Sequence, residues 1–178
     1  MQNTFSSTEM HLFVGWHVIY TKPRHEKRVF EELTCQKFTS YLPVIKHTSQ
    51  WCDRQKIIDK PLFPSYIFVN LQNAIEYHRA LQINGAVSFI RFNDKPAIVK
   101  ESEIETIKKM IENCSKIELA QQNIRVGEKC QIQSGPLAGF KCEVISMTGK
   151  NKILVRIDSL RQNITAELDG SCMLKVIS

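Results

Sequence analysis

Apolar residues recur with a period of two near the start of the readable chain. Trp16, Val18 and Tyr20 occupy every second position, which predicts a β-strand with one buried face. Pro23 follows this run. Because proline is favoured in the first turn of a helix, a helix is predicted from there to about Lys37.

The middle of the first half carries an extended and charged stretch. Residues 41–45 read as a short extended piece, with Pro43 marking it as irregular or at a sheet edge. Residues 46–60 are rich in charge and are expected to form a projecting hairpin or a long loop. Residues 63–71 are apolar on both faces and form the clearest predicted strand.

Capping residues predict two further helices. Asn73 is expected to cap a short helix through Leu81, and a strand over 87–92 follows the next turn. Ser102 with Glu105 three residues later predicts a capping box. This second helix should pair Glu105 with Lys109 and bury an apolar stripe formed by Ile104, Ile107 and Ile111. The order β-α-β-β-α-β-α predicts a ferredoxin-like split βαβ domain with one added helix.

The sequence pattern changes after residue 123, from mixed helices and strands to short strands alone. Five short predicted strands are separated by glycine-containing turns: 129–133, 140–146, 153–157, 163–168 and 173–177. Such closely spaced strands favour a small closed or half-open barrel. The fold class is therefore α+β. The expected organisation is a loose tail over 1–11, a mixed domain over 12–112, a linker over 113–123 and an all-β domain over 124–178.

Composition narrows the class of protein. Of 178 residues, 43% are hydrophobic and 24% charged, which excludes global disorder. The net charge of +6 favours polyanionic partners without proving nucleic-acid binding. The longest early apolar run, 12–20, is too short for a membrane helix and lacks a signal-peptide pattern, so a cytoplasmic location without membrane association is expected.

No arrangement of residues predicts catalysis or metal binding. Six cysteines are scattered without a C-x-x-C spacing, so no metal site is expected. The chain has no glycine-rich phosphate loop, no G-x-S-x-G and no H-E-x-x-H motif. A nucleophilic pair of Cys35 or Cys52 with His25 or His47 has no supporting spacing. The protein is expected not to be an enzyme and to need no cofactor.

Strand alternation supplies a candidate protein-binding surface. Tyr66 and Phe68 share one face of their predicted strand, and Ile90 and Phe92 share one face of theirs. If the two strands are neighbours, the four side chains form one apolar patch suited to a protein interface. From the residues alone, the alternative is that all four form core beneath the helices.

Two basic regions are candidates for nucleic-acid binding. The turn into the first helix concentrates cations around a single acid, Glu26: Lys22, Arg24, His25, Lys27 and Arg28. These cations could contact phosphates, or they could simply be a solvated helix face. Trp51, Arg54 and Lys56 in the charged stretch combine an aromatic ring with cations and could approach DNA or a protein partner.

Three separated blocks in order resemble the NusG family of transcription factors. They are WHVIYTKPRHEKRVFEEL (16–33), PLFPSYIFVNL (61–71) and GAVSFIRFNDKPAIV (85–99), and they are followed by RVGEKCQIQSGPLAGFKCEV (125–144), which is similar to the KOW motif. The resemblance implies a NusG N-terminal (NGN) domain followed by an SH3-like KOW barrel. It implies that Tyr66, Phe68 and Phe92 contact the clamp helices of the largest RNA polymerase subunit, with Ile90 in the same patch. Lys22, His25 and Arg28 match positions that face non-template DNA in RfaH-like members.

Other features are similar to the specialised RfaH and UpxY-type antiterminators. Ser65 stands where housekeeping members usually show glycine, and QWCDRQKIIDKPLFPSYIFV (50–69) resembles UpxY proteins, which the family links to capsular polysaccharide operons. Two departures are Cys142, where the KOW pattern has a second glycine, and Glu76-Tyr77-His78, where RfaH has a polymerase-contacting His-Thr-Thr stretch.

The resemblance implies a function and its alternatives. The first expectation is an operon-specific elongation and antitermination factor that acts as a monomer on RNA polymerase and on non-template or upstream DNA. Its barrel would recruit a ribosomal protein or the termination factor Rho. The alternatives are a general NusG-like factor acting with Rho and a ribosome-associated KOW protein that binds RNA without polymerase.

Overall fold

The computed structural model describes residues 13–51, 54–92, 95–119, 129–133, 137–146, 151–168 and 174–176. The predicted tail over 1–11 lies outside these ranges. Two units emerge: Met1–Pro43 with Phe63–Glu101, and Val44–Leu62 with Ser102–Ser178. The domain bounds 12–112 and 124–178 stay a prediction.

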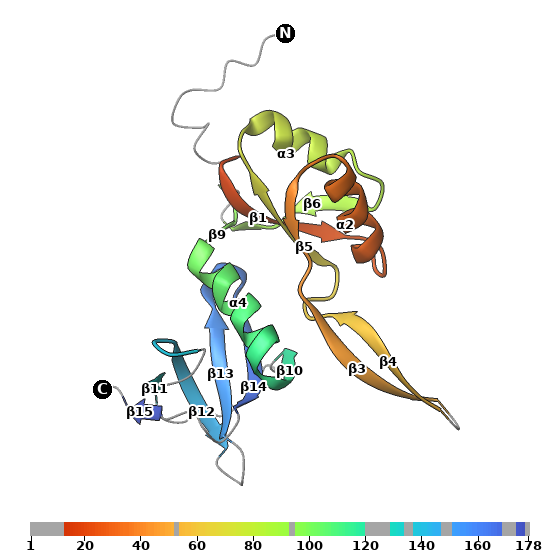
Figure 1. Cartoon of the computed structure of the whole chain (residues 1–178). Helices are drawn as coiled ribbons and strands as arrows, with labels where there is room; N and C mark the ends of the chain where they lie inside the picture. Colours follow the sequence, from red (N-terminus) through yellow and green to blue (C-terminus); the bar gives the residue numbers. More distant parts are fainter. Residues whose placement is uncertain are drawn as a thin grey trace. The chain divides into compact units, whose positions relative to one another are not determined.

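The first unit is built on an antiparallel sheet in the order β2-β5-β1-β6 (Figure 1). Its strands are β1 (Gly15–Thr21), β2 (Thr39–Tyr41), β5 (Tyr66–Leu71) and β6 (Ala86–Phe89). Helix α2 (Glu26–Cys35) connects β1 to β2, and α3 (Ala74–Leu81) connects β5 to β6. This βαββαβ order with β1 and β5 in the centre is the predicted ferredoxin-like plan.

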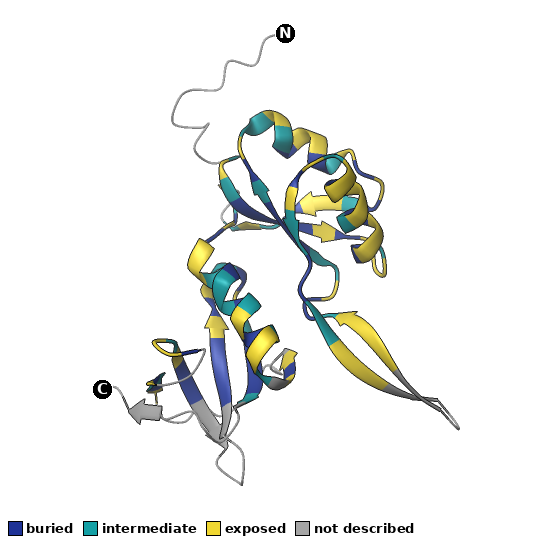
Figure 2. Ribbon diagram, viewed as in Figure 1, coloured by how far each residue is buried: buried dark blue, intermediate teal, exposed yellow. Residues whose placement is uncertain are grey.

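Both helices begin where local chemistry allows. The Asn73 side-chain oxygen accepts a hydrogen bond from the Glu76 N–H at 2.9 Å, which confirms the predicted cap of α3. Helix α2 begins at Glu26 rather than at Pro23, because Arg24 has φ +64°, a conformation that a right-handed helix cannot contain. The outward sides of both helices are exposed and the strands beneath are mostly buried (Figure 2).

The predicted strand over 87–92 is divided in the structure. After β6, the Ile90 N–H donates to the Val18 carbonyl at 2.8 Å, and the Ile90 carbonyl accepts from the Ala97 N–H at 2.8 Å. The chain then forms a small hairpin from β7 (Arg91–Phe92) and β8 (Lys95–Pro96). Strand β9 (Ile98–Val99) returns to pair with β1. The division follows because β1 takes two successive partners along this edge.

Residues 44–51 and 54–61 form a long two-stranded hairpin. Strands β3 (Val44–Trp51) and β4 (Arg54–Pro61) pair without interruption from Val44 opposite Pro61 to Trp51 opposite Arg54. Of the two predicted alternatives, hairpin or long loop, the hairpin is confirmed.

The second sheet has the order β10-β14-β13-β12-β11-β15, and all its pairs are antiparallel. The five predicted strands are present as β11 (Lys129–Ile132), β12 (Lys141–Ser146), β13 (Asn151–Ile157), β14 (Gln162–Leu168) and β15 (Leu174–Val176). A single 3-10 turn, η2 (Asp158–Leu160), separates β13 from β14. The last strand returns to pair with β11, as an SH3-like barrel requires.

The stretch predicted as a linker carries a sixth strand, β10 (Ser115–Leu119), which pairs with β14. Ile117 in this strand is buried. The linker prediction for 113–123 is therefore wrong over these five residues. Among the described side chains of this strand, residues 116–118, only that of Ile117 is buried, which gives too short a pattern for periodicity to reveal.

Helix α4 (Glu101–Asn113) differs from its prediction in its first residue and in its ion pair. Ser102 lies inside the helix instead of capping it, and Glu105 pairs with Lys108 at 2.8 Å instead of with Lys109. Glu101 is the first residue of the helix, and its carboxylate accepts a hydrogen bond from Trp16 Nε1. The helix therefore starts before the predicted cap. Its buried stripe is formed by Ile104, Ile107 and Met110, whereas Ile111 is half-buried.

Candidate functional site

Strand register places a row of aromatic and apolar residues on one face of the first sheet. Tyr20 is opposite Tyr66 and Val18 is opposite Phe68 across β1 and β5, and Tyr41 of β2 is opposite Phe68. Residues directly opposite one another in an antiparallel pair lie on the same face. We call this set, with Ile90, the tyrosine face.

The opposite face of the sheet is the one that α3 covers. The ring of His17 packs edge-on against Tyr77 of α3 at 6.2 Å and against Phe89 at 5.8 Å. Tyr77 also stacks on Phe89, with centroids 4.0 Å apart. Because side chains alternate along a strand, residues adjacent to His17 and Phe89 point to the side without this helix. The tyrosine face is therefore not core beneath α3.

Aromatic rings form a partly exposed rim on the tyrosine face. Tyr20 is 38% exposed, and Tyr66 and Tyr41 are half-buried. The rings of Tyr20 and Tyr66 meet edge-to-face at 6.0 Å. Sequence reasoning identified Tyr66 but not Tyr20 or Tyr41, although Tyr20 alternates in register with Val18.

Phe68 does not belong to the exposed rim. It has no accessible surface, and its ring lies between Phe63, 5.7 Å away, and Tyr41, 6.2 Å away. Its assignment as a surface contact is corrected to a support beneath the rim. Alternation predicted the face correctly, but it could not show that the turn before the strand returns Phe63 onto this ring.

Ile90 joins the tyrosine face and Phe92 lies beyond it. Ile90 is bonded through its backbone to Val18 and is half-buried, which puts it in register with Val18 and Phe68. Phe92 belongs to the separate β7–β8 hairpin, where it is opposite Lys95 and half-buried. The predicted four-residue patch is thus brought together for Tyr66, Phe68 and Ile90, while Phe92 stands on a neighbouring element.

A tight turn positions Tyr66. The Tyr66 N–H donates to the Phe63 carbonyl at 3.2 Å, with Pro64 and Ser65 between them, and Ser65 has φ +64°. Proline second and a positive φ third is the pattern of a type II turn, where glycine is preferred in the third position. Ser65 therefore holds a conformation that glycine would adopt without strain.

Glu26 holds this turn in place. The Ser65 N–H donates to Glu26 Oε1 at 2.8 Å, and the Ser65 carbonyl accepts from the Thr21 N–H at 2.8 Å. Glu26 is only 7% exposed. The acid that stands alone among the cations of the α2 turn is thus a structural acceptor. In the sequence, the one sign of this structural role was that Glu26 is the only acid in a basic stretch.

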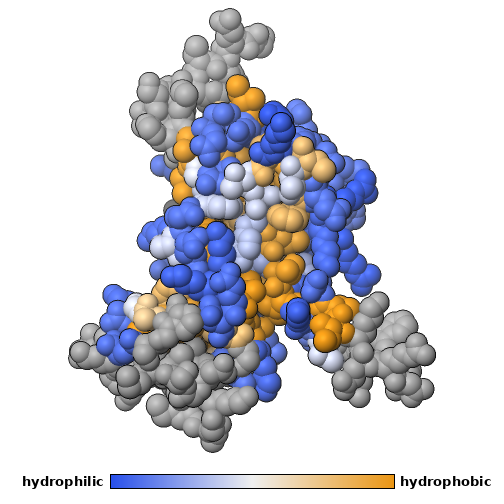
Figure 3. Space-filling view, in the orientation of Figure 1, coloured by the Kyte–Doolittle hydropathy of each residue, from blue (hydrophilic) through white to orange (hydrophobic). Residues whose placement is uncertain are grey.

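The basic turn is exposed as predicted for a solvent- or phosphate-facing surface. Four cations are exposed and His25 is half-buried. The exposed cations are Lys22, Arg24, Lys27 and Arg28. Hydrophilic residues cover α2 in the space-filling view (Figure 3). Within the described ranges no salt bridge engages these four, so their charge is available to an anionic partner.

Backbone contacts fix the shape of the basic turn. The Lys22 N–H donates to the Gly85 carbonyl at 2.8 Å, and His25 Nδ1 lies 3.1 Å from the Pro23 carbonyl oxygen. Gly85 has φ +106°, and a Cβ there would approach Val29 Cγ2 to 2.9 Å. Only glycine therefore lets the chain pass this closely under α2.

The hairpin candidates Trp51, Arg54 and Lys56 share one set of register positions. Trp51 is opposite Arg54, and Lys56 is opposite Ser49, two residues farther along each strand. The backbone thus places all three on one face of the hairpin. Their side chains lie outside the described structure.

Comparison with known proteins decides the family. A family model described as transcription termination factor NusG matches residues 15–108, more than half of the chain. The chain belongs to the NusG family. The transcription termination/antitermination protein NusG of Rickettsia bellii is 26% identical over 135 residues, covering 70% of each chain. A solved structure described as domain interaction in Thermotoga maritima NusG has a TM-score of 0.56 at 19% identity, covering 92% of this chain and 97% of that one.

The NusG-family match agrees with the two-part fold. The Thermotoga maritima likeness extends over both the ferredoxin-like sheet and the barrel, which supports an NGN domain followed by a KOW barrel. The family match shows that the chain is a NusG-like transcription factor.

Two departures from the NusG pattern now have structural accounts. Cys142 lies in regular pairing opposite Cys130, and both side chains are buried in the barrel. Burial raises the pKa of the Cys142 thiol to about 11. The positive φ of this segment is at Gly139, +88°, so glycine is not required at 142. The barrel core accepts the thiol in its place.

The second departure, Glu76-Tyr77-His78, is mostly structural. Glu76 Oε2 accepts from the Gln72 N–H at 2.8 Å, and Tyr77 is buried against Phe89. His78 is exposed. These roles give no ground for transferring the RfaH polymerase contact to this stretch.

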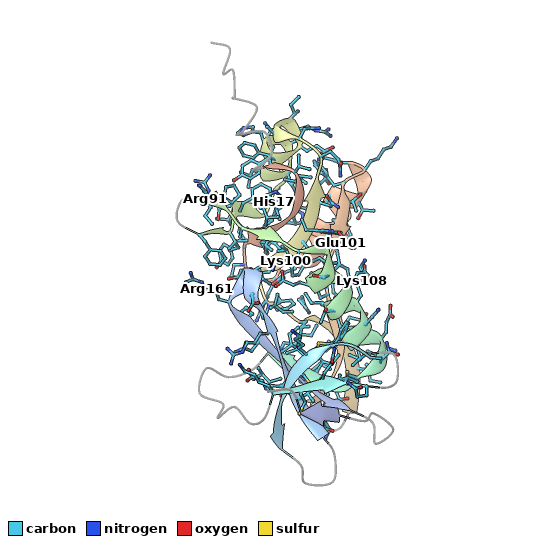
Figure 4. All side chains as sticks on the ribbon, turned by 90° about the vertical axis from the view of Figure 1, so that its left-hand side faces the viewer. His17, Arg91, Lys100, Glu101, Lys108 and Arg161 are labelled. Carbon is cyan, nitrogen blue, oxygen red and sulfur yellow. The ribbon has the colours of Figure 1, made fainter. Side chains whose placement is uncertain are left out.

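His17 is a buried histidine under α3 (Figure 4). Neither ring nitrogen has a hydrogen-bond partner of ordinary geometry. Burial lowers its pKa from 6.5 to about 4, and a weaker backbone interaction with Ala97 offsets only part of this. His17 therefore serves as a neutral core residue at pH 7.

The described residues hold no cluster of three or more His, Cys, Asp or Glu side chains that could bind a metal ion. Within the same ranges no helix is long and apolar enough to cross a membrane.

Proposed function

We propose that this NusG-family protein is a transcription elongation and antitermination factor that binds the clamp helices of the largest RNA polymerase subunit. The observation that carries the proposal is the tyrosine face. On it Tyr20, Tyr66 and Tyr41 share with buried Phe68 the side of the sheet away from α3. Large aromatic side chains supported by a packed core are the usual energetic centre of a protein interface.

The rim is suited to a helical partner because its rings are already ordered. Tyr20 and Tyr66 restrain each other edge-to-face, and Phe63 supports Phe68 beneath them. A surface ordered before binding loses less side-chain entropy when the partner docks. Ile90 extends the apolar centre, and Phe92 on its own hairpin provides a neighbouring contact.

The basic turn would engage non-template or upstream DNA beside the polymerase. Lys22, Arg24, Lys27 and Arg28 are exposed, and His25 lies among them. Contacts from such cations to phosphates add affinity without reading sequence and weaken as salt rises. Trp51, Arg54 and Lys56 of the hairpin are further candidates for contact with DNA or polymerase.

The mechanism requires binding and no catalysis. A factor that binds the closed clamp more tightly than the open clamp shifts the polymerase toward the closed, elongating state. Pausing is then disfavoured for as long as the factor remains bound. The KOW barrel recruits a second factor, a ribosomal protein or Rho.

Operon-specific action is the favoured role. Its support is the similarity to UpxY and RfaH-type members, including Ser65 in a turn position that prefers glycine. A general factor acting with Rho would bind polymerase through the same face on every operon. A ribosome-associated KOW protein would bind RNA and would not need the tyrosine face.

Elongation by the cognate RNA polymerase tests this function. Pause lifetimes are measured with the wild-type protein on a template carrying a capsular polysaccharide leader and on an unrelated template. Shortened pauses on the first template alone support the operon-specific role, and shortened pauses on both favour a general factor. Unchanged pauses on both, together with RNA binding, would move the assignment to a ribosome-associated protein.

A further inference from the structure

Two cysteines face each other across neighbouring strands of the barrel. Cys130 of β11 is directly opposite Cys142 of β12, in an antiparallel register without a shift. Their side chains are 3% and 5% exposed, and both are thiols in the structure. Residues directly opposite one another in an antiparallel pair lie on the same face. The two sulfurs are therefore buried together on the core side of this strand pair.

The hydrogen-bond pattern sets the distance between the two backbones. The Ile132 N–H donates to the Phe140 carbonyl at 3.0 Å, so these residues occupy a hydrogen-bonded position of the ladder. Such positions recur at every second residue, and the next one is Cys130 opposite Cys142. Cα atoms at a hydrogen-bonded position are about 5.5 Å apart, and disulfides span Cα distances of roughly 4.4–6.8 Å. The strand register therefore already suits a disulfide.

The two thiols influence each other electrostatically. Burial raises the pKa of the Cys142 thiol to about 11, and a charge on Cys130 adds to this rise, as expected of two sulfurs close together. At neutral pH Cys142 is therefore protonated and reacts slowly while the barrel is closed. Cys142 also stands where the KOW pattern has glycine, and the regular strand there gives no backbone reason for either residue.

We propose that Cys130 and Cys142 are a redox-sensitive pair, which a peroxide converts into a reversible disulfide between β11 and β12. The thiolate of one cysteine attacks a peroxide oxygen, the O–O bond breaks, and a sulfenic acid and hydroxide form. The second thiol attacks the sulfenic sulfur, so that the S–S bond forms while the S–O bond breaks and water leaves. Overall, two thiols and one hydrogen peroxide give one disulfide and two waters, and the sulfurs supply the two electrons that reduce the peroxide.

The disulfide would act as a lock on the barrel. It closes a short loop, 131–141, between two strands that are already paired, and a closed loop lowers the entropy of the unfolded chain. Buried thiols are reached through local opening of the strands, so the bond forms when the barrel opens and then keeps it closed. Small thiols reverse it by exchange. This property goes beyond binding of polymerase or DNA and requires neither.

Peptide mapping of the full-length wild-type protein tests the proposal. The protein is treated with hydrogen peroxide at neutral pH, remaining thiols are blocked with iodoacetamide, and trypsin is added. Trypsin separates the two cysteines into peptides 130–141 and 142–150, because a lysine stands before and at the end of each. Mass spectrometry should find these peptides joined with the loss of two hydrogen atoms, and dithiothreitol should separate them.

A thermal melt tests the lock itself. Peroxide should raise the unfolding midpoint of the wild-type protein by roughly 5 °C or more, and dithiothreitol should remove the increase. Cys142→Ala is the matched control, in which peroxide should neither join the peptides nor raise the midpoint. Cys130→Ala provides the same control from the other strand, and circular dichroism identifies the variants that are folded.

Three results would overturn the proposal. The first is recovery of Cys130 and Cys142 as alkylated thiols while the exposed Cys35 has been oxidised, which would make the pair an inert part of the core. The second is a disulfide from either residue to Cys35 in place of the pair. The third is a joined pair with an unchanged or lower midpoint, which would show that the bond does not lock the barrel.

Discussion

Tyr66 lies opposite Tyr20 across the two central strands, and their rings meet edge-to-face with centroids 6.0 Å apart. The pair stands on the side of the sheet away from α3, on the same face as the buried side chain of Phe68. Immediately before Tyr66, Ser65 is held by Glu26 from the start of α2. One partly buried hydrogen bond therefore links the proposed polymerase-binding rim to the basic turn.

Glycine at position 65 should stabilise the protein. Ser65 has φ +64° in a turn that prefers glycine, and relief of this strain is worth about 1 kcal/mol. Ser65→Gly should raise the free energy of unfolding in urea by that amount. Ser65→Val should lower it, because a β-branched side chain is poorly tolerated at positive φ. A lower stability for Ser65→Gly would contradict the turn described here.

Removal of the Glu26 carboxylate should loosen the turn before Tyr66. Glu26→Ala leaves the Ser65 N–H without its acceptor and should cost about 1–3 kcal/mol. Glu26→Gln retains an acceptor oxygen and should recover most of that loss. Urea denaturation compares the three proteins. Equal losses for alanine and glutamine would show that charge, rather than the hydrogen bond, is what matters.

Stability should fall in acid because of His17. Its folded-state pKa of about 4 lies below the ordinary value of 6.5, so the unfolded chain binds the proton more tightly. The contribution of neutral His17 to the free energy of unfolding is complete above pH 6.5 and is lost as the pH falls from 6.5 to 4. At 1.36 kcal/mol per pKa unit it amounts to roughly 3 kcal/mol.

His17→Phe is the matched variant for that measurement. It keeps a ring between Tyr77 and Phe89 but cannot bind a proton. Urea midpoints between pH 7.5 and 4.5 should fall less steeply for the variant than for the wild type. Parallel pH profiles would assign the acid sensitivity to other groups.

Cys142→Gly should weaken the barrel even though it restores the usual KOW residue. Cys142 is buried opposite Cys130 in regular strand pairing. Loss of the buried side chain and the added backbone freedom should together cost about 2 kcal/mol. Cys142→Ala separates the two causes, because it removes the sulfur without the glycine penalty. A thermal melt in which Cys142→Gly is unchanged would contradict the described packing.

Much of the fold is readable from local chemistry in the sequence. The Asn73 cap, the five barrel strands and the ferredoxin-like order follow from capping, turns and periodicity. Periodicity failed where long-range contacts decide. Ser102 has the sequence of a cap, yet the helix begins earlier at Glu101, which bonds to distant Trp16.

The sequence predicted which residues of the candidate site share a sheet face, but not how deeply each of them is buried. Alternation places Tyr66 and Phe68 together, and only the turn that returns Phe63 shows which of them is covered. The exposed cations of the basic turn were found by composition alone. The role of Glu26 depends on a partner 39 residues away, which no local pattern contains.

The central claim is that the tyrosine face binds the clamp helices, and equilibrium binding to a clamp-helix fragment of the cognate RNA polymerase tests it most directly. Tyr20→Ala/Tyr66→Ala should lose about 2 kcal/mol, or roughly 30-fold in affinity. The control Ile75→Ala removes a residue that is 71% exposed on α3 and should bind like the wild type. Circular dichroism must show that all three proteins are folded. Wild-type affinity in the folded double tyrosine variant would contradict the account.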